Sequence, residues 1–266
     1  MGLEKVKELK LKCLHMCIDA GTGHVTSAFS CAEILFALYY KKMRIDPKNP
    51  DWEDRDRFVM SKNHGSVMLL PILEDLGFIK DKCKTFLQDG SIYGEHTKLE
   101  IPGVDFAGGS LGIGIGVSCG MAYSAQCDRK DWKTYCLVGD GECYEGSVWE
   151  AAMFAGHHKL RNLVVIIDRN KLCLSAQTEK LLRQESLKEK WEAFNWEVRE
   201  VDGHNVNNIL DALQDVDSRL SDKPLCIIAH TIKGKGVHFM EGNPFFHGVA
   251  PKGEKAEQAI KEIEEE

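Results

Sequence analysis

The residues best suited to chemistry are an aspartate between two glycines, Gly139-Asp140-Gly141, and an asparagine, Asn170, about thirty positions later. Each follows an apolar run, at 135–138 and 163–167. Mg²⁺ prefers a near-octahedral shell of oxygen ligands and usually takes only one or two of them from side chains. Asp140, Asn170 and a backbone carbonyl just after Asn170 could supply three ligands, and a diphosphate the rest. Glycines let the backbone approach phosphates closely. The pattern predicts a Mg²⁺ site, also suited to Ca²⁺ or Mn²⁺, that holds a diphosphate.

Two simpler interpretations compete with this one. An Asp-Gly pair after a strand is often only a tight turn, so the case for a metal depends on the matching place of Asn170. The glycines at 109, 112, 114 and 116 could suggest a dinucleotide-binding loop, but they lack the GxGxxG spacing and no convincing strand precedes them. These glycines could also serve only for close helix packing, and that alternative stays open.

Strands and helices in alternation must position these side chains. Apolar runs predict strands at 135–138, 163–167, 196–201 and 225–230, and helical spacing predicts helices at 5–20, 30–40, 66–76, 146–157 and 206–217. Such alternation is typical of an α/β fold in which helices cover both faces of a parallel sheet. Asp140 and Asn170 then follow the carboxyl ends of strands, where such sheets bind ligands.

Composition narrows the possible functions. The 266 residues carry 34 Lys and Arg against 41 Asp and Glu, a formal charge of −7, and no basic patch suggests nucleic acid. No apolar run is long enough for a membrane span and the N-terminus is polar, so we expect a cytoplasmic protein with no membrane partner. The ten cysteines are scattered and are expected as small buried hydrophobes. We expect one domain over residues 1–251 and a charged C-terminal tail over 252–266.

A series of motifs links these residues to a known family. The segment Glu145-Gly146-Ser147-Val148-Trp149-Glu150-Ala151-Ala152 lies between Asp140 and Asn170, and with them resembles the thiamine diphosphate motif of transketolase. Further segments resemble that family in order: Gly23-His24, Ser61-Lys62-Asn63-His64-Gly65-Ser66, Gly94-Glu95-His96, Pro102-Gly103-Val104, Gly109-Ser110-Leu111-Gly112, Thr231–Gly236 and Phe246-His247-Gly248. The resemblance runs from about Leu11 to Pro251. The chain therefore looks like the N-terminal, diphosphate-binding half of a transketolase.

The resemblance implies thiamine diphosphate and Mg²⁺ as cofactors. It makes Asp140, Asn170 and the carbonyl of Leu172 the metal ligands, and places backbone groups near Leu111 against the aminopyrimidine ring. Glu145 resembles a carboxylate at the dimer contact, although a solvated glutamate at a helix start is also plausible. The implied cofactor-binding residues are His24, His64, Ser110, Leu111, Gly112, Gly139, Asp140, Gly141, Glu142, Asn170, Leu172 and His247.

The resemblance also implies three catalytic histidines, His24, His96 and His247. His24 and His247 would lie between the diphosphate and the substrate, and His96 would contact the C1 hydroxyl of a ketose donor. Imidazoles suit this work because cleaving a carbon–carbon bond beside a ketone moves protons on and off neutral oxygens. The implied reaction transfers a two-carbon ketol unit from a ketose to an aldose.

Part of the expected active site is missing from this chain. In the family, the carboxylate that bonds the pyrimidine ring and most basic residues for sugar phosphates belong to the next domain. We therefore expect a second polypeptide, the C-terminal transketolase subunit with the pyrimidine-binding domain, in an α₂β₂ heterotetramer that works on sugars or sugar phosphates. Two alternatives remain, the alpha chain of a 2-oxo acid dehydrogenase and a non-catalytic partner that binds the cofactor without turnover.

Three positions depart from the family pattern. Val25 and Thr97 each follow a predicted catalytic histidine where proline is common, and Asn63 replaces a glycine just before His64. These changes predict an unusual donor, such as a deoxy or sulfonated analogue of a sugar phosphate. We expect Asn63 to adopt a positive φ, which asparagine tolerates better than most residues.

Overall fold

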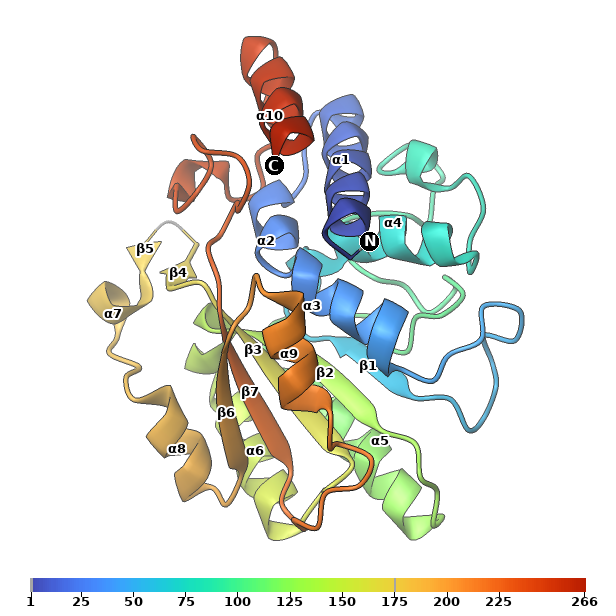
Figure 1. The fold of residues 1–266 in the computed structure, drawn as a ribbon, viewed down its shortest axis with the longest axis vertical. Helices are drawn as coiled ribbons and strands as arrows, with labels where there is room; N and C mark the ends of the chain where they lie inside the picture. The colour runs from blue at the N-terminus through green and yellow to red at the C-terminus, as the bar shows by residue number, and fades with distance from the viewer. Residues whose placement is uncertain (1, 175) are drawn as a thin grey trace.

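The computed structural model describes residues 2–174 and 176–266, and its centre is a five-stranded sheet in which all neighbouring strands are parallel (Figure 1). The strands lie in the order β1-β2-β3-β7-β6. Their bounds are β1 Arg57–Met60, β2 Thr134–Gly139, β3 Leu163–Arg169, β6 Glu197–Asp202 and β7 Leu225–His230. Four of these strands coincide with the predicted apolar runs, so the α/β fold with a parallel sheet is confirmed.

Helices cover both faces of the sheet. The main helices are α1 Gly2–Ala20, α2 Val25–Ser30, α3 Ala32–Ala37, α4 Ser66–Leu76, α5 Gly114–Cys127, α6 Gly146–His157, α8 Leu187–Ala193 and α9 Val206–Leu213. Alternate residues of a strand point to opposite faces, so Tyr135 and Leu137 of β2 enter one apolar core while Cys136 and Val138 enter another. The first core is closed by α1 to α4 and α9, and the second by α5, α6 and α8.

Short elements follow the carboxyl ends of several strands. They are the 3-10 turns η2 Asn63–Gly65, η4 Gly141–Tyr144 and η5 Pro244–Phe246, the antiparallel pair β4 Leu172–Cys173 and β5 Ala176–Gln177, and the helix α7 Thr178–Leu181. A further 3-10 turn, η3 Cys83–Thr85, follows α4. Because η2 comes just after β1 and η4 just after β2, these turns lie at the same edge of the sheet.

The single helix predicted over residues 30–40 is wrong. The structure has α2, then α3 and a π-helical turn, η1 Leu38–Lys42, with the break at Cys31. Ser30 Oγ lies 3.0 Å and Cys31 Sγ lies 3.3 Å from the Ser27 carbonyl oxygen. Side chains that bond back to the preceding turn compete with the helix's own hydrogen bonds and bend it.

Two further differences are a strand that the sequence does not predict and a helix that is shorter than predicted. Strand β1 is absent from the strands that the sequence predicts, because a run of four residues is too short for periodicity to identify it. The helix predicted over 206–217 ends earlier, at Leu213 in α9. Element ends are the least predictable part of a pattern because local signals there are weak.

The charged segment after residue 251 forms a helix, α10 Glu254–Glu265, that lies beside α1 (Figure 1). The Lys10 side chain of α1 is only 1% exposed and forms ion pairs with Glu33 at 3.0 Å and with Glu266 at 3.2 Å. The end of the chain is therefore joined to the helical layer by a partly buried charge network.

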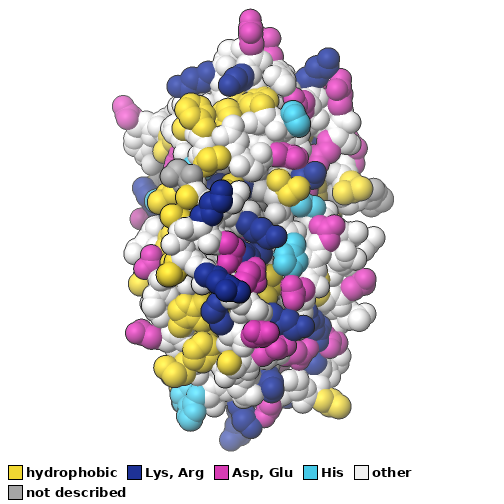
Figure 2. Space-filling model, turned by 90° about the vertical axis from the view of Figure 1, so that its left-hand side faces the viewer, with side chains coloured by type: hydrophobic (Ala, Val, Ile, Leu, Met, Phe, Trp, Pro, Cys, Tyr) yellow, Lys and Arg dark blue, Asp and Glu magenta, His cyan; other side chains and the backbone are white. Residues whose placement is uncertain are grey.

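Surface and interior features bear on the other sequence expectations. Over residues 2–174 and 176–266, no helix combines the length and apolar character needed to cross a membrane. On the face shown in Figure 2, Lys and Arg side chains lie among Asp and Glu and do not gather into a patch of one sign. All ten cysteines are free, and most are buried as expected.

Candidate active site

The carboxyl ends of four neighbouring strands meet at one pocket. Lys62 follows β1, Asp140 follows β2, Asn170 follows β3 and Lys233 follows β7, and all four line this pocket. Ligands bind at this edge of parallel sheets because the residues after several strands converge there. The other lining residues are His64, Leu111, Gly139, Gly141, Glu142, Leu172, Cys173, Leu174 and His247. Most residues predicted to bind the cofactor therefore share one pocket.

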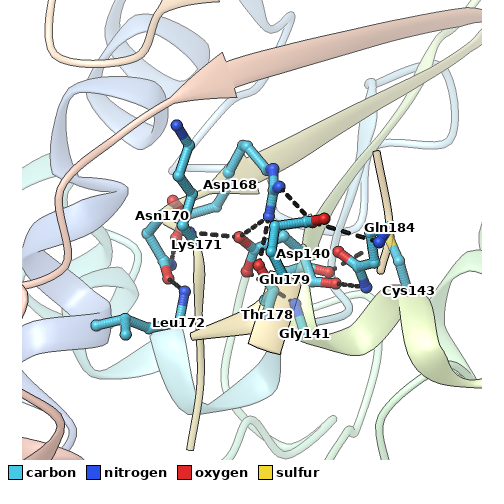
Figure 3. Close-up of polar contacts among 12 residues, drawn as sticks. Asp140, Gly141, Cys143, Asp168, Asn170, Lys171, Leu172, Thr178, Glu179 and Gln184 are labelled. Carbon is cyan, nitrogen blue, oxygen red and sulfur yellow. Dashed lines mark hydrogen bonds and ion pairs between the residues drawn. The ribbon is translucent and has the colours of Figure 1, made fainter. Parts of the chain in front are cut away.

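Asp140 is almost fully buried, and its carboxylate is held by its neighbours (Figure 3). Oδ1 accepts from the N–H of Gly141 at 2.8 Å, and Oδ2 accepts from Arg169 at 3.1 Å and from the N–H of Lys171 at 2.5 Å. Burial raises the pKa of Asp140 to about 6, and the nearby Asp168 carboxylate adds to the rise. A cation bound here would relieve the cost of two neighbouring buried acids.

Asn170 contributes an amide to the same pocket. Its Oδ1 accepts from the N–H of Leu172 at 3.1 Å, and its Nδ2 donates to Asp168 at 3.3 Å. These two bonds fix the orientation of the amide and leave Oδ1 with one free lone pair.

The oxygens present fit a divalent cation whose shell is completed by a bound anion. Asp140 Oδ1 and Asn170 Oδ1 each accept a single bond within the chain, and Leu172 lines the pocket beside them. Across the described residues, no group of three or more His, Cys, Asp or Glu side chains could hold a metal. One carboxylate and one amide are too few for Mg²⁺, so the oxygens of a bound diphosphate and of water would have to supply the remaining ligands.

Arg169 is a buried cation that the sequence does not single out. Its side chain is 1% exposed and bonds Asp140 at 3.1 Å, Thr178 at 2.8 Å, Glu179 at 3.0 Å and Glu185 at 2.7 Å. It therefore ties the end of β3 to α7 and to the segment beyond. Because Arg169 and the N–H of Lys171 both bond Oδ2 of Asp140, Oδ1 is the oxygen that would hold a metal ion.

A second buried ion pair joins Lys62 to Asp168, whose side chains are 1% and 0% exposed. Lys62 also donates to the Ser27 carbonyl at 3.1 Å, while Asp168 accepts from Ser30 at 2.5 Å and from the Thr231 hydroxyl. Burial alone would raise the pKa of Asp168, but the Lys62 ammonium lowers it below its usual value. This network holds together the ends of β1, β3 and β7 and the helix α2.

Glu142 lines the pocket, but its carboxylate accepts hydrogen bonds from other residues of the chain. Oε1 accepts from the N–H of Gly112 at 2.8 Å and from Ser61 at 2.5 Å, and Oε2 accepts from the N–H of Gly139 at 3.0 Å. The Gly112 N–H, which lies among the backbone groups predicted to pack against the cofactor ring, therefore already has a partner. A Cβ at Gly114 would lie 2.6 Å from Ser61 Oγ, so close packing explains that glycine.

Three of the predicted histidines form one cluster. Their ring centroids lie 5.7 Å apart for His24 and His64, 5.0 Å for His24 and His247, and 5.8 Å for His64 and His247. They come from the start of α2, from η2 and from the end of η5. Gly248 has φ +73°, and a Cβ there would lie 3.2 Å from His24 Nε2. A glycine at this position keeps the histidine cluster free of steric strain.

Lys233 lies 2.8 Å from His247 Nδ1. Burial lowers the pKa of Lys233 to about 8 with a further contribution from Lys62, and burial with Lys233 lowers the pKa of His247 to about 4. Burial also lowers the pKa of His64 well below its usual value. Both imidazoles are therefore neutral near pH 7. Because a charged lysine only donates, His247 Nδ1 is the acceptor and its proton lies on Nε2.

Comparison with known proteins decides the family. Residues 3–264 match the model for the thiamine diphosphate-binding domain of transketolase. This chain belongs to the transketolase family. The transketolase structure from Campylobacter jejuni superposes with a TM-score of 0.91 and 33% identity over 98% of this chain, but over only 42% of that chain.

Relatives of two lengths match this transketolase chain. It is 43% identical over all 266 residues to one of the subunits of the apulose-4-phosphate transketolase of Phocaeicola vulgatus, and the match covers 94% of that protein. It is 39% identical over 92% of its length to the 6-deoxy-6-sulfo-D-fructose transketolase subunit SqwG of Clostridium sp., 90% of which is covered. It is 37% identical to the Homo sapiens transketolase but spans only 41% of it. The expected N-terminal subunit of a split transketolase is confirmed.

Some predicted residues of this transketolase chain lie outside the pocket lining, namely His24, Ser110, Gly112 and His96. His24 still joins the histidine cluster, but Ser110 and His96 are exposed. His96 Cδ2 lies 3.7 Å from where a Cβ of Gly109 would be, so it sits against the glycine-rich loop. The roles of His96 and Ser110 at the donor and cofactor stay predictions.

Lys62, Lys233 and Glu95, like Arg169 and Asp168, are site residues of this transketolase chain to which sequence analysis assigns no role. Glu95 Oε2 lies 2.6 Å from His24 Nδ1, and the contact holds the pKa of Glu95 below its usual value. The sequence feature that could have identified the two lysines is their position, since both follow the carboxyl ends of strands. That signal was weak for Lys62 because β1 itself is not predicted.

Proposed function

We propose that this chain is the diphosphate-binding subunit of a two-chain transketolase that uses thiamine diphosphate and Mg²⁺ to transfer a two-carbon ketol unit from a ketose to an aldose. The observation that carries the proposal is the pocket in which Asp140 and Asn170 lie with the lysines Lys62 and Lys233. The almost full-length match to named transketolase subunits supports it.

The chain's own residues would anchor the cofactor. Lys233 is 3% exposed, and an anionic diphosphate would favour its charged form, which burial disfavours. Asp140, Asn170 and the Leu172 carbonyl would hold the metal against the diphosphate. When bound, thiamine diphosphate supplies the nucleophile and the electron sink for carbon–carbon cleavage.

The histidine cluster would move protons at the substrate. Neutral His247 presents Nε2–H as a donor, because its Nδ1 faces Lys233. The Glu95 carboxylate, 2.6 Å from His24 Nδ1, orients the His24 ring. The rings of His24 and His247, whose centroids lie 5.0 Å apart, can serve different hydroxyl groups of the substrate. One ring would act as proton acceptor and the other as donor.

We propose a modified ketose as the donor. Two relatives are named for apulose 4-phosphate and for 6-deoxy-6-sulfo-D-fructose, and this chain departs from the family pattern beside its histidines. A panel of these two sugars with fructose 6-phosphate and xylulose 5-phosphate tests the proposal. We expect kcat/KM for a modified donor to exceed that for either unmodified phosphate by about tenfold or more. Equal or reversed preference would reject this donor class.

Exposed apolar side chains near the pocket support a partner chain. Leu174, which lines the pocket, is 63% exposed, and Phe245 and Ile113 are 70% and 48% exposed. Phe245 and Ile113 each lie two positions from a lining residue. Apolar groups around a site mark interaction surfaces. We propose that the C-terminal transketolase subunit covers them in an α₂β₂ assembly and contributes the pyrimidine-binding domain.

Asp140→Ala tests the metal site in the complex of this chain with its partner. We expect the variant to lose Mg²⁺-dependent binding of thiamine diphosphate, measured by titration calorimetry, because it removes the only side-chain carboxylate among the proposed ligands. Asp128→Ala, at an exposed aspartate that ends α5, is the matched control and should bind normally. Unchanged affinity in Asp140→Ala would remove the assignment of the metal site.

Turnover of 2-oxo acids without ketose turnover would favour the dehydrogenase alternative.

A further inference from the structure

Two residues that depart from the family pattern are bonded to each other. Asn63 Oδ1 accepts from the N–H of Thr97 at 2.9 Å, and Asn63 Nδ2 donates to the Thr97 hydroxyl at 2.7 Å. The two residues are buried, at 0% and 4% exposed. A glycine and a proline at these positions could not form the bonds, because glycine has no side chain and proline has no N–H. The two departures are therefore one structural feature.

The position of Asn63 differs from the sequence expectation. Asn63 begins the turn η2 and is not among the residues with positive φ, so the predicted positive φ is wrong. The residue contributes through its side-chain amide and not through an unusual backbone conformation.

The Asn63–Thr97 pair joins three segments of the chain. Asn63 Nδ2 also lies 3.1 Å from the carbonyl of Met60 at the end of β1, and the Thr97 hydroxyl donates to the carbonyl of Phe106 at 2.7 Å. Gly108 packs against the amide, since a Cβ there would lie 2.2 Å from Asn63 Nδ2. The amide therefore fills the space between the turn after β1, the loop that carries Thr97 and the glycine-rich loop that carries Gly108.

The loop anchored by Thr97 carries Glu95, which contacts the histidine cluster, and His96, the predicted contact to the donor. Glu95 contacts His24 through its carboxylate, and its carbonyl accepts from Ser66 at 2.6 Å. His96 is the residue immediately before Thr97. A shift of Thr97 would move both Glu95 and His96 relative to the histidine cluster.

We propose that Asn63 and Thr97 are a positioning pair that sets the donor preference of this chain by holding Glu95 against His24 and His96 against the glycine-rich loop. The inference rests on the proposed function and names the residues that select its ketose. Neither residue lines the diphosphate pocket. The pair therefore acts on the donor and leaves cofactor affinity unchanged.

The test replaces each residue by the one in the family pattern, as Asn63→Gly, Thr97→Pro and the double variant, in the complex with the partner chain. Each single change leaves a buried polar group without its partner, so kcat/KM for the preferred donor should fall about 10- to 100-fold. The double variant removes both members of the pair together, so its loss should be clearly smaller than the sum of the two single losses. Thr97→Ser keeps both bonds and is the matched control, with kinetics close to those of the natural chain.

The proposed role in donor preference predicts a second result for the same variants. The donor panel should show the preference moving toward the unmodified ketose phosphates in the double variant, with the affinity for thiamine diphosphate retained. Losses that add in the double variant, equal losses for every donor, or a parallel loss of cofactor affinity would each overturn the proposal.

Hydrogen exchange separates this inference from the proposed function. The buried Thr97 N–H should exchange slowly in the natural chain and at least about tenfold faster in Asn63→Gly, because the Asn63 Oδ1 acceptor is removed. Protection that persists in this variant overturns the pair whatever the activity. If the natural complex transfers no ketol unit, the donor role fails with the proposed function, while exchange still reports whether Asn63 holds the loop.

Discussion

Lys233 and His247 show how burial tunes single residues of this site. Their nitrogens lie 2.8 Å apart, and burial lowers the pKa of Lys233 to about 8 and that of His247 to about 4. At neutral pH the pair therefore holds one positive charge, on the lysine, beside the diphosphate pocket. The imidazole remains neutral and able to exchange a proton with substrate.

Cofactor affinity should depend on the charge of Lys233. A lowered lysine pKa means that the charge is present below pH 8 and is lost above it, so the affinity of the complex for thiamine diphosphate should fall as pH rises through 8. If the cofactor binds only when Lys233 is charged, its affinity should fall by about fivefold between pH 8 and 9, because the charged fraction of the lysine falls by that factor. Titration calorimetry at pH 7, 8 and 9 measures it.

Two variants control this pH experiment. Lys233→Met should bind weakly at pH 7 and show no slope, while Lys235→Met, at a more exposed lysine two positions away, should keep the slope. A slope that survives in Lys233→Met would assign the titration to another group.

At the scale of elements, the buried Lys62–Asp168 pair joins strands that are far apart in the chain. Its two residues are separated by 106 positions, and Asp168 also accepts from Ser30 of α2 and Thr231 after β7. The same lysine lines the diphosphate pocket. The arrangement of the strand ends and the charge of the site therefore depend on one ion pair.

Asp168→Ala should lower the free energy of unfolding by about 3–5 kcal/mol, because it leaves the Lys62 charge buried without a partner. Replacing both residues, as Lys62→Met with Asp168→Leu, should recover most of this loss. Denaturant unfolding measures both. Asp222→Ala breaks the exposed Lys159–Asp222 pair and should leave stability nearly unchanged. A small effect of Asp168→Ala, equal to that of the control, would contradict the structural role of the pair.

For the whole molecule, the site is open on a side that exposes apolar side chains. Leu174 lines the pocket and is 63% exposed. The relatives that this chain covers almost completely are named as transketolase subunits. Both observations support the proposed partner that closes the site.

The chain alone should show no ketol transfer, whereas the mixture with its partner should be active and have the mass of two copies of each chain. Light scattering after size exclusion measures the mass. Leu174→Glu should weaken assembly because it places a charge in an apolar contact. Leu220→Glu, at a fully exposed leucine outside the pocket lining, is the matched control. Full activity of the purified chain would reject the split enzyme.

Local patterns predict the elements that bear Asp140 and Asn170 because apolar runs and helical spacing reflect burial along a single segment. Helices α4 and α6 and strand β7 begin and end where those patterns indicate. The break at Cys31 and strand β1 could not be predicted in this way. The neighbouring Ser30 bonds Asp168, which is 138 positions away, and β1 gains its structure by pairing with β2.

Residue types and their order along the chain were enough to predict the family, the α/β fold and the shared position of Asp140 and Asn170, which line one pocket. The three-dimensional structure was needed to show that Lys62 and Lys233 join the pocket, that the Glu142 carboxylate is used within the fold, and that Asn63 bonds Thr97. These pairings depend on the strand order β1-β2-β3-β7-β6 and on loops that meet at its carboxyl-terminal edge. No local pattern encodes that order, because it arises from contacts between segments far apart in the chain.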